Sequence, residues 1–136
     1  MTRDDLAVVS RLFACWGADD LEGVLACVDP DVEWRSTIDS RAYRGHDGMR
    51  QVFGRWRGPG EQLEVPLQRV VEVAPGQILA VGRIRVMRPG RGLADSPGIW
   101  LLQMEGGRIK RAESFRSERE ARQAIRCAPG SVATGA

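Results

Sequence analysis

The sequence has few of the residues that build metal sites and disulfide frameworks. Its 136 residues include three cysteines and one histidine. Cys15 and Cys27 fall in segments of helical periodicity, and Cys127 lies near the end of the chain. One histidine does not complete the Cys/His spacing of a zinc site. We therefore expect three reduced thiols and no bound metal.

The sequence also lacks a long apolar run and a concentrated charge. No stretch approaches the roughly 18 apolar residues of a membrane helix, and the opening MTRDDLAVVS is acidic where a secretory signal is basic. The net charge is +2, and the 20 basic residues, all arginine except Lys110, are interleaved with acidic residues. These features predict a soluble cytoplasmic protein whose partners include neither membranes nor nucleic acid.

What the chain does contain is enough apolar sequence for one domain. Its hydrophobic content is 43%, and 136 residues are too few for two domains of usual size. The closing APGSVATGA offers almost nothing to bury. We expect one domain over residues 1–127 and a flexible tail over residues 128–136.

Apolar residues at helical spacing predict four helices. The first covers residues 2–17. The second covers residues 21–28 and stops before Pro30, because proline cannot continue a helix. The third covers residues 46–57, and the last covers residues 117–126, where a serine followed three residues later by glutamate is typical of a helix start.

Two-residue alternation of apolar and polar side chains predicts strands over residues 31–36, 63–73, 77–87 and 99–115, the last interrupted by a tight Gly-Gly turn. Between them, residues 37–45 are rich in turn formers.

Residues 88–98 form a longer connection that is rich in glycine and proline. We expect a loop there, at the rim of a pocket.

Four local sequences resemble one known family in the same order and with similar spacing. They are DPDVEWRS, YRGHDGMRQVFGRW, VGRIRV and GGRIKRAESFRSEREA. The chain resembles the SnoaL-like, polyketide cyclase-like branch of the nuclear transport factor 2-like superfamily. The resemblance implies an α+β fold shaped like a cone. Three N-terminal helices pack on a curved, mostly antiparallel sheet in this fold, a short C-terminal helix follows, and a ligand enters at the open end.

Within such a fold, strand parity assigns side chains to the cavity. If Trp34 faces inward, alternate residues of the later strands do so too, and residues of the third helix close the space. The alternative for the aromatic residues is that they fill the core. The predicted ligand pocket consists of Trp34, Ser36, Tyr43, Trp56, Ile84, Val86, Trp100, Leu102, Met104 and Ser114.

The resemblance also shows which known chemistries lack their residues here. Ketosteroid isomerases use a tyrosine, an aspartate base and a second aspartate. The resemblance places Leu12, Ser36 and Trp100 of this chain at those three positions. In SnoaL-like cyclases, Trp100 corresponds to the catalytic histidine, and Glu113 or Ser117 to the acid. Limonene epoxide hydrolase, a relative of the same fold, activates water with an Asp-Arg-Asp arrangement. This sequence offers no pair of carboxylates that is expected to face the cavity. The acid-base positions of all three are vacant.

Three other polar residues remain as catalytic candidates. Arg116 could hold a carboxylate, phenolate or enolate as a permanently charged donor. His46 could act as a general base, and Asp39 could orient it. The alternatives are that Arg116 points out of the mouth or pairs with Asp39, that His46 only caps or packs against its helix, and that Asp39 forms a solvated turn.

Two functions follow from these residues. The first is a cofactor-independent enzyme of cyclase, isomerase or hydrolase type that acts on a polyketide-like or other cyclic carbonyl substrate. The second is a non-catalytic protein that binds a small apolar or aromatic molecule in the same cavity.

The outer face of the sheet predicts how the chain assembles. It carries apolar side chains among charged ones, which is typical of a homodimer interface. The alternative is a monomer whose last helix, residues 117–126, folds back over this face. The apolar residues are Val81, Met87, Ile99, Leu101 and Phe115.

Overall fold

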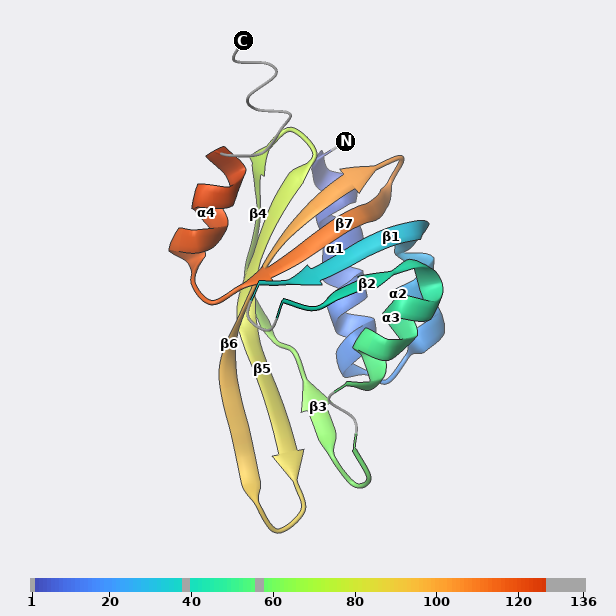
Figure 1. Ribbon diagram of the computed structural model, residues 1–136, viewed down its shortest axis with the longest axis vertical. Coiled ribbons are helices and arrows are strands. Elements are labelled where there is room, and N and C mark those ends of the chain that lie inside the picture. The colour runs from blue at the N-terminus through green and yellow to red at the C-terminus, as the bar shows by residue number, and fades with distance from the viewer. Residues whose placement is uncertain (1, 38–39, 56–57, 127–136) are drawn as a thin grey trace.

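The computed structural model describes residues 2–37, 40–55 and 58–126. The predicted tail, residues 128–136, lies outside the described residues. The helices are α1 (Thr2–Gly17), α2 (Leu21–Ala26), α3 (Gly45–Gly54) and α4 (Glu118–Arg126) (Figure 1). No helix within the described ranges is long and apolar enough to cross a membrane.

The strands form one sheet. They are β1 (Val28–Ser36), β2 (Ala42–Arg44), β3 (Gln62–Glu64), β4 (Leu67–Ala74), β5 (Gln77–Arg88), β6 (Gly92–Glu105) and β7 (Arg108–Phe115). The order is β2-β1-β7-β6-β5-β3, and β4 pairs with β5 beside β3. The β1–β7 pair is parallel and the other pairs are antiparallel. The predicted α+β class with a curved, mostly antiparallel sheet is confirmed.

The expected loop over residues 88–98 is wrong, because most of it belongs to β6. The pairing of β5 with β6 starts at Arg88↔Gly92 and continues without a register shift to Gln77↔Gln103. The turn is tight: Arg91 N–H donates to Arg88 C=O at 3.0 Å, and Gly90 and Gly92 have φ of 73° and 80°. The glycines therefore allow one short turn. Residues 92–98 have low strand propensity, and they form a strand because β5 supplies their hydrogen-bonding partners.

Two smaller boundaries also differ from the prediction. Helix α2 ends at Ala26, and Val28 already pairs with Ile109 of β7. The apolar character of Val28 therefore reflects strand burial and not the helix. The turn-rich stretch of residues 37–45 contains β2, in which Tyr43 pairs with Trp34 of β1. A three-residue strand has too little sequence to show an alternating pattern.

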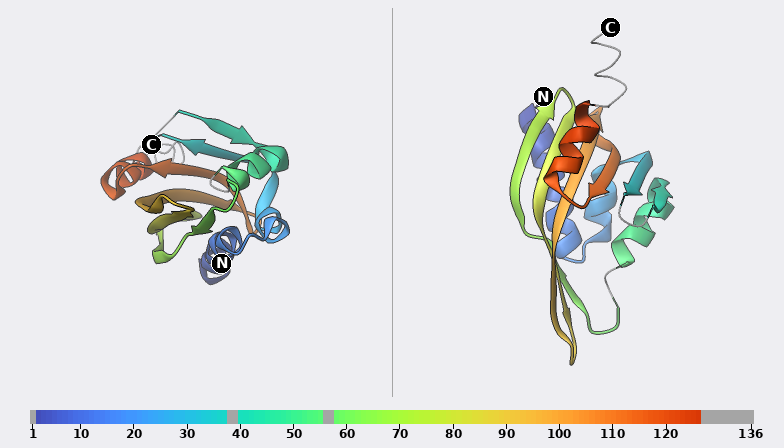
Figure 2. Two further views of the ribbon diagram at one scale, coloured as in Figure 1. Left: turned by 90° about the horizontal axis from the view of Figure 1, so that it is seen from below. Right: turned by 60° about the vertical axis from the view of Figure 1, so that its left-hand side comes forward.

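The sheet is covered on both faces. Helices α1, α2 and α3 lie on the inner face, whereas α4 lies on the outer face (Figure 2). The inner core joins α1–α3 to inward residues of β1, β3, β5, β6 and β7. Tyr43 of β2 and Leu67 and Val70 of β4 are partly buried and pack against it. A smaller outer core consists of Leu79, Ile99, Phe115 and Ala121. Since Ala121 belongs to α4, the last helix does fold back over the centre of the outer face.

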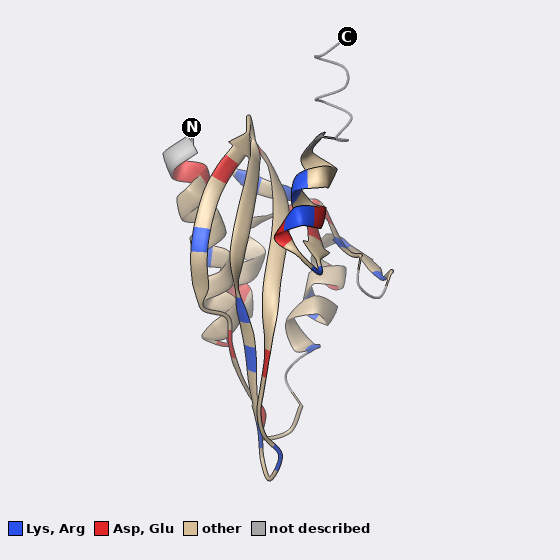
Figure 3. Cartoon of the chain, turned by 90° about the vertical axis from the view of Figure 1, so that its left-hand side faces the viewer, with Lys and Arg blue, Asp and Glu red and all other residues tan. Residues whose placement is uncertain are grey.

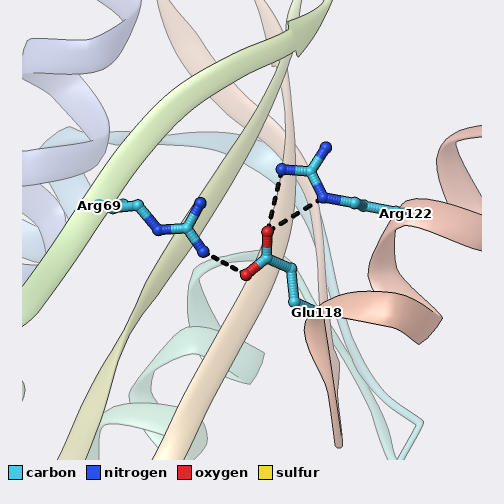
Figure 4. A network of polar contacts seen from close by, with 3 residues as sticks. All are labelled: Arg69, Glu118 and Arg122. Carbon is cyan, nitrogen blue, oxygen red and sulfur yellow. Dashed lines mark hydrogen bonds and ion pairs between the residues drawn. The ribbon is translucent and has the colours of Figure 1, made fainter.

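Charged side chains hold α4 in this position. The carboxylate of Glu118 accepts hydrogen bonds from Arg69 of β4 and from Arg122 of its own helix (Figure 4). These two guanidinium groups lower the pKa of Glu118 below its ordinary value. The Ser117 hydroxyl accepts the backbone N–H of Glu120 at 3.2 Å, so the predicted serine cap is confirmed.

The rest of the outer face carries exposed ion pairs, and Figure 3 marks the basic and acidic positions along the chain. Arg83 meets Asp95 at 3.0 Å, and Arg44 and Arg111 meet Glu33 at 3.3 and 3.4 Å. Exposed pairs of this kind contribute roughly 0.2–1 kcal/mol each. They make this surface a solvated one, apart from the apolar side chains at its margins, Val71, Met87 and Leu93.

Candidate functional site

A cavity of about 360 Å³ lies where the sheet opens. The last residue pair between β6 and β7 is Ile99↔Phe115, so residues 92–98 of β6 pair with β5 alone. The cavity is bordered by this free part of β6, the end of β7, β1, β2 and the C-terminal end of α3. It is lined by Trp16, Trp34, Ser36, Tyr43, Val52, Arg55, Ile84, Ser96, Pro97, Gly98, Ile99, Trp100, Ser114, Phe115 and Arg116.

The inner wall of the cavity is an aromatic cluster. Phe13 lies at its centre, with ring centroids 4.5 Å from Trp100, 6.0 Å from Trp16 and 6.5 Å from Trp34. Trp16 and Trp34 meet edge to face at 6.3 Å and 79°. Such tilted and edge-to-face contacts are the favoured geometry for aromatic pairs. The same rings therefore form both the core and the wall of the cavity.

Strand register places a polar row beside this wall. Ser36 of β1 pairs with Ser114 of β7, which pairs with Trp100 of β6. The end of β1 is tied to β7 by Thr37, whose backbone N–H and hydroxyl donate to the Ser114 carbonyl at 3.1 and 2.7 Å. Because paired residues share a face of the sheet, both serines and Trp100 point to the cavity side.

Close packing of α3 fixes Tyr43. A Cβ added at Gly48 would lie 2.9 Å from the backbone carbonyl carbon of Tyr43, so α3 approaches β2 as closely as only glycine allows. Tyr43 also pairs with Trp34, which places its ring at the edge of the aromatic wall.

The mouth of the cavity is basic. Arg55 follows α3, Arg116 follows β7, and both are exposed residues of the lining. The lining residues described by the structure include no carboxylate and no histidine. Within the same described ranges, no group of three or more His, Cys, Asp or Glu side chains could hold a metal ion. The polar groups at this site are guanidinium and hydroxyl groups.

Seven of the predicted site residues line the cavity. They are Trp34, Ser36, Tyr43, Ile84, Trp100, Ser114 and Arg116. Three others, Val86, Leu102 and Met104, are buried in the inner core and do not contribute to the lining.

His46 does not contribute to the lining either. It is half-buried in the first turn of α3, and its Nε2 has no hydrogen-bond partner among the described residues. Asp39 and Trp56 lie outside the described residues, so their predicted roles stay predictions.

Sequence reasoning missed Arg55 and the β6 residues Ser96 and Pro97. Arg55 follows Val52 at a spacing of three, which places both on one side of a helix, and this spacing was the available signal. For Ser96 and Pro97 the signal was the pocket rim expected over residues 88–98, although this segment is a strand and not a loop.

The two described cysteines have thiol pKa values above the ordinary one. Burial, and after it the nearby Cys15 thiol, raise the pKa of Cys27. Burial also raises the pKa of Cys15, with Asp20 adding to the effect. Both thiols therefore stay protonated near neutral pH, and neither lines the cavity.

Comparison with known proteins agrees with this architecture. The family model of the SnoaL-like domain matches residues 9–112. The uncharacterized protein Rv0034 of Mycobacterium tuberculosis is 33% identical over 120 residues, covering 85% of this chain and 91% of the relative. The chain therefore belongs to the SnoaL-like family of the nuclear transport factor 2-like superfamily.

Two solved structures show the same fold. An NTF2-like protein of unknown function from Burkholderia pseudomallei has a TM-score of 0.70 at 22% identity, over 90% of this chain and 97% of that one. TerC, co-crystallised with polyporic acid, has a TM-score of 0.69 at 20% identity, over 90% of this chain and 98% of that one.

Proposed function

We propose that this protein binds a small, cyclic and largely apolar molecule that carries an anionic oxygen group. The observation that carries the proposal is the composition of the cavity: indole walls inside, two arginines at the mouth, and no carboxylate among the described lining residues. A carboxylate, phenolate or enolate on a planar ring system matches that distribution. TerC, which shares the fold, was co-crystallised with polyporic acid, and this supports the same class of ligand.

The two ends of such a ligand contribute differently. Stacking and burial against Trp34 and Trp100 supply affinity without regard to charge. Arg116 supplies selectivity, since hydrogen bonds to a charged group contribute roughly 1.5–3 kcal/mol. A cavity of about 360 Å³ is at the small end of the range for ligand sites, so one or two fused rings fit it best.

The test compares a charged ligand with a neutral one of similar shape. Calorimetry with 2-naphthoate and 2-acetylnaphthalene is carried out on the wild type and on Arg116→Met. We expect the variant to bind 2-naphthoate roughly tenfold or more weakly and to keep its affinity for 2-acetylnaphthalene. Arg35→Met, at an exposed position of β1 outside the lining, is the matched control. A wild type that prefers the neutral ligand would contradict the proposal.

A second candidate function is catalysis, as a cofactor-independent enzyme of cyclase, isomerase or hydrolase type acting on a polyketide-like carbonyl compound. The hydroxyl groups of Tyr43, Ser36 and Ser114 beside Arg116 favour it, because these donors suit an enolate oxygen. The described lining offers no base. The acid-base candidates that the sequence supplies are His46, which lies outside the lining, and Asp39, which could orient it.

The catalytic candidate is tested by exchange of the α-protons of 2-tetralone in D₂O, followed by NMR. Catalysis predicts faster exchange with the wild type, loss of the acceleration in Arg116→Met, and a smaller loss in His46→Gln. A wild type that leaves the exchange rate unchanged would contradict catalysis on this ketone.

We further propose a homodimer through the part of the outer face that α4 leaves open. Met87 and Leu93 pair across the β5–β6 hairpin and are 48% and 44% exposed. Beside them lie Arg83, Arg85 and Asp95, so the patch carries both signs of charge. We call these five residues the hairpin patch. A two-fold axis through it would bring Asp95 of one copy to the arginines of the other.

A further inference from the structure

Position 98 has no room for a side chain because the indole of Trp100 occupies the space. A Cβ built on Gly98 would lie 2.2 Å from Cη2, 2.7 Å from Cζ3 and 3.0 Å from Cζ2 of Trp100. These atoms form the outer edge of the six-membered ring. Residues 98 and 100 share a face of β6, so the ring leans back along the strand and rests on the backbone of Gly98.

The resting place of the ring lies between the core and the mouth. On one side Trp100 contacts Phe13 at 4.5 Å and Trp16 at 6.3 Å between ring centroids. On the other side Gly98, Pro97 and Ser96 line the outer part of the cavity. Trp100 is 2% exposed and belongs to the lining. The indole is therefore the floor of the cavity.

A ring pushed off Gly98 has one direction in which to move. Phe13 and Trp16 occupy the core side, and the paired residues Ala80 and Ser114 flank it within the sheet. Close-packed side chains yield little, whereas the cavity of about 360 Å³ is free space next to the ring. A side chain at position 98 would therefore displace the indole into the cavity and reduce the depth open to a ligand.

We propose that Gly98 is a specificity-determining residue that sets the upper size limit of the ligand by letting Trp100 lie flat on β6. This inference rests on the proposed binding of cyclic anions. With glycine at position 98 the cavity takes a two-ring aromatic acid. With alanine the floor rises and the site takes a one-ring acid.

The test measures binding of benzoate, 2-naphthoate and anthracene-2-carboxylate by calorimetry. Gly98→Ala should weaken binding of 2-naphthoate by about tenfold or more, the usual effect of one methyl group in an apolar pocket, and that of benzoate far less. Gly54→Ala is the matched control, because a Cβ there meets nothing within 4 Å and Gly54 is not in the lining. It should leave all three affinities unchanged.

Trp100→Phe makes the test independent of whether Gly98→Ala folds. Phenylalanine lacks the outer part of the indole, so Trp100→Phe alone should gain affinity for anthracene-2-carboxylate. In the double variant Gly98→Ala/Trp100→Phe, the affinity for 2-naphthoate should return.

Three outcomes would overturn the role of Gly98. These are unchanged 2-naphthoate binding in Gly98→Ala, an equal loss for all three acids, and no gain of the three-ring acid in Trp100→Phe. A wild type that binds none of the three acids overturns the proposed function as well. If the wild type and Gly98→Ala bind 2-naphthoate with the same affinity, only the size limit is overturned.

Discussion

Trp16, Trp34 and Trp100 are each at most 4% exposed, yet all three line the cavity. A ring can be almost fully covered and still present one edge to an enclosed space. Substitution at these positions therefore changes stability and binding together, and the two effects must be measured separately. Arg55 and Arg116 are exposed, so their substitution should change binding with little effect on folding.

Among the rings of the aromatic cluster, Trp16 has a buried N–H group that destabilises the fold. Its Nε1 is buried and has no hydrogen-bond acceptor among the described residues, and an unpaired buried donor costs roughly 1–3 kcal/mol. Trp16→Phe removes this donor, which offsets part of the lost packing. We expect it to lower the free energy of unfolding by about 1 kcal/mol or less, against about 3–5 kcal/mol for Trp16→Ala. Urea denaturation of the two variants measures the difference. A loss for Trp16→Phe well above about 1 kcal/mol would show that Nε1 is paired in solution.

At the scale of residues, strand parity predicted which face of the sheet a side chain occupies. It did not predict whether that side chain lines the cavity or lies deeper, in the core. Trp34, Ser36, Trp100 and Ser114 line the cavity as expected. Val86 has the same parity as Ile84 but lies opposite Leu63 and Ala94, in the core. Alternation along a strand repeats without marking where the sheet opens, so distance from the mouth needs the strand pairing, which the sequence does not contain.

At the scale of elements, α4 is the part of the fold that depends most on charge. It spans nine residues, and such a short helix gains most of its stability from tertiary contacts. Its apolar contact with the sheet centres on Ala121, a small side chain. The pairs that Glu118 makes with Arg69 and Arg122 therefore matter more here than surface pairs usually do.

Acid should loosen α4. Because the pKa of Glu118 is lower in the folded state, this carboxylate stabilises the fold above its unfolded pKa of roughly 4.3. The contribution is lost as the pH falls through the folded value. We expect Glu118→Gln to speed amide exchange in α4 at pH 7, and the difference from the wild type to shrink below about pH 4. Glu120→Gln, at an exposed position of the same helix, is the control. A Glu118→Gln effect that persists unchanged in acid would contradict the assignment.

The elements that the sequence predicted well are those with a long periodic pattern. Residues 2–17 form α1 and residues 77–87 lie within β5, as expected. Residues 92–98 did not resemble a strand, because glycine, proline and small polar residues dominate there. They are strand because β5 offers a continuous hydrogen-bonding edge, and such non-local pairing overrides propensity.

At the scale of the whole molecule, both faces of the sheet are partly covered, and this limits how a second copy can attach. Ile99 and Phe115 of the expected interface are 6% exposed beneath α4. The hairpin patch remains, beyond the reach of α4 on the β5–β6 hairpin that extends from the body of the fold (Figure 1). A dimer through the hairpin patch would leave α4 in place and would lie beside the free part of β6 that borders the cavity.

Light scattering at micromolar concentration tests this assembly. We expect twice the 15.0 kDa of one chain for the wild type and one chain for Met87→Glu, because a carboxylate in a desolvated apolar contact disfavours association. Val71→Glu is the matched control: Val71 is also apolar, outward-facing and 37% exposed, but lies on β4, away from the hairpin patch. It should leave the mass unchanged. A wild-type mass of one chain removes the dimer, and a Met87→Glu variant that stays dimeric places the interface elsewhere.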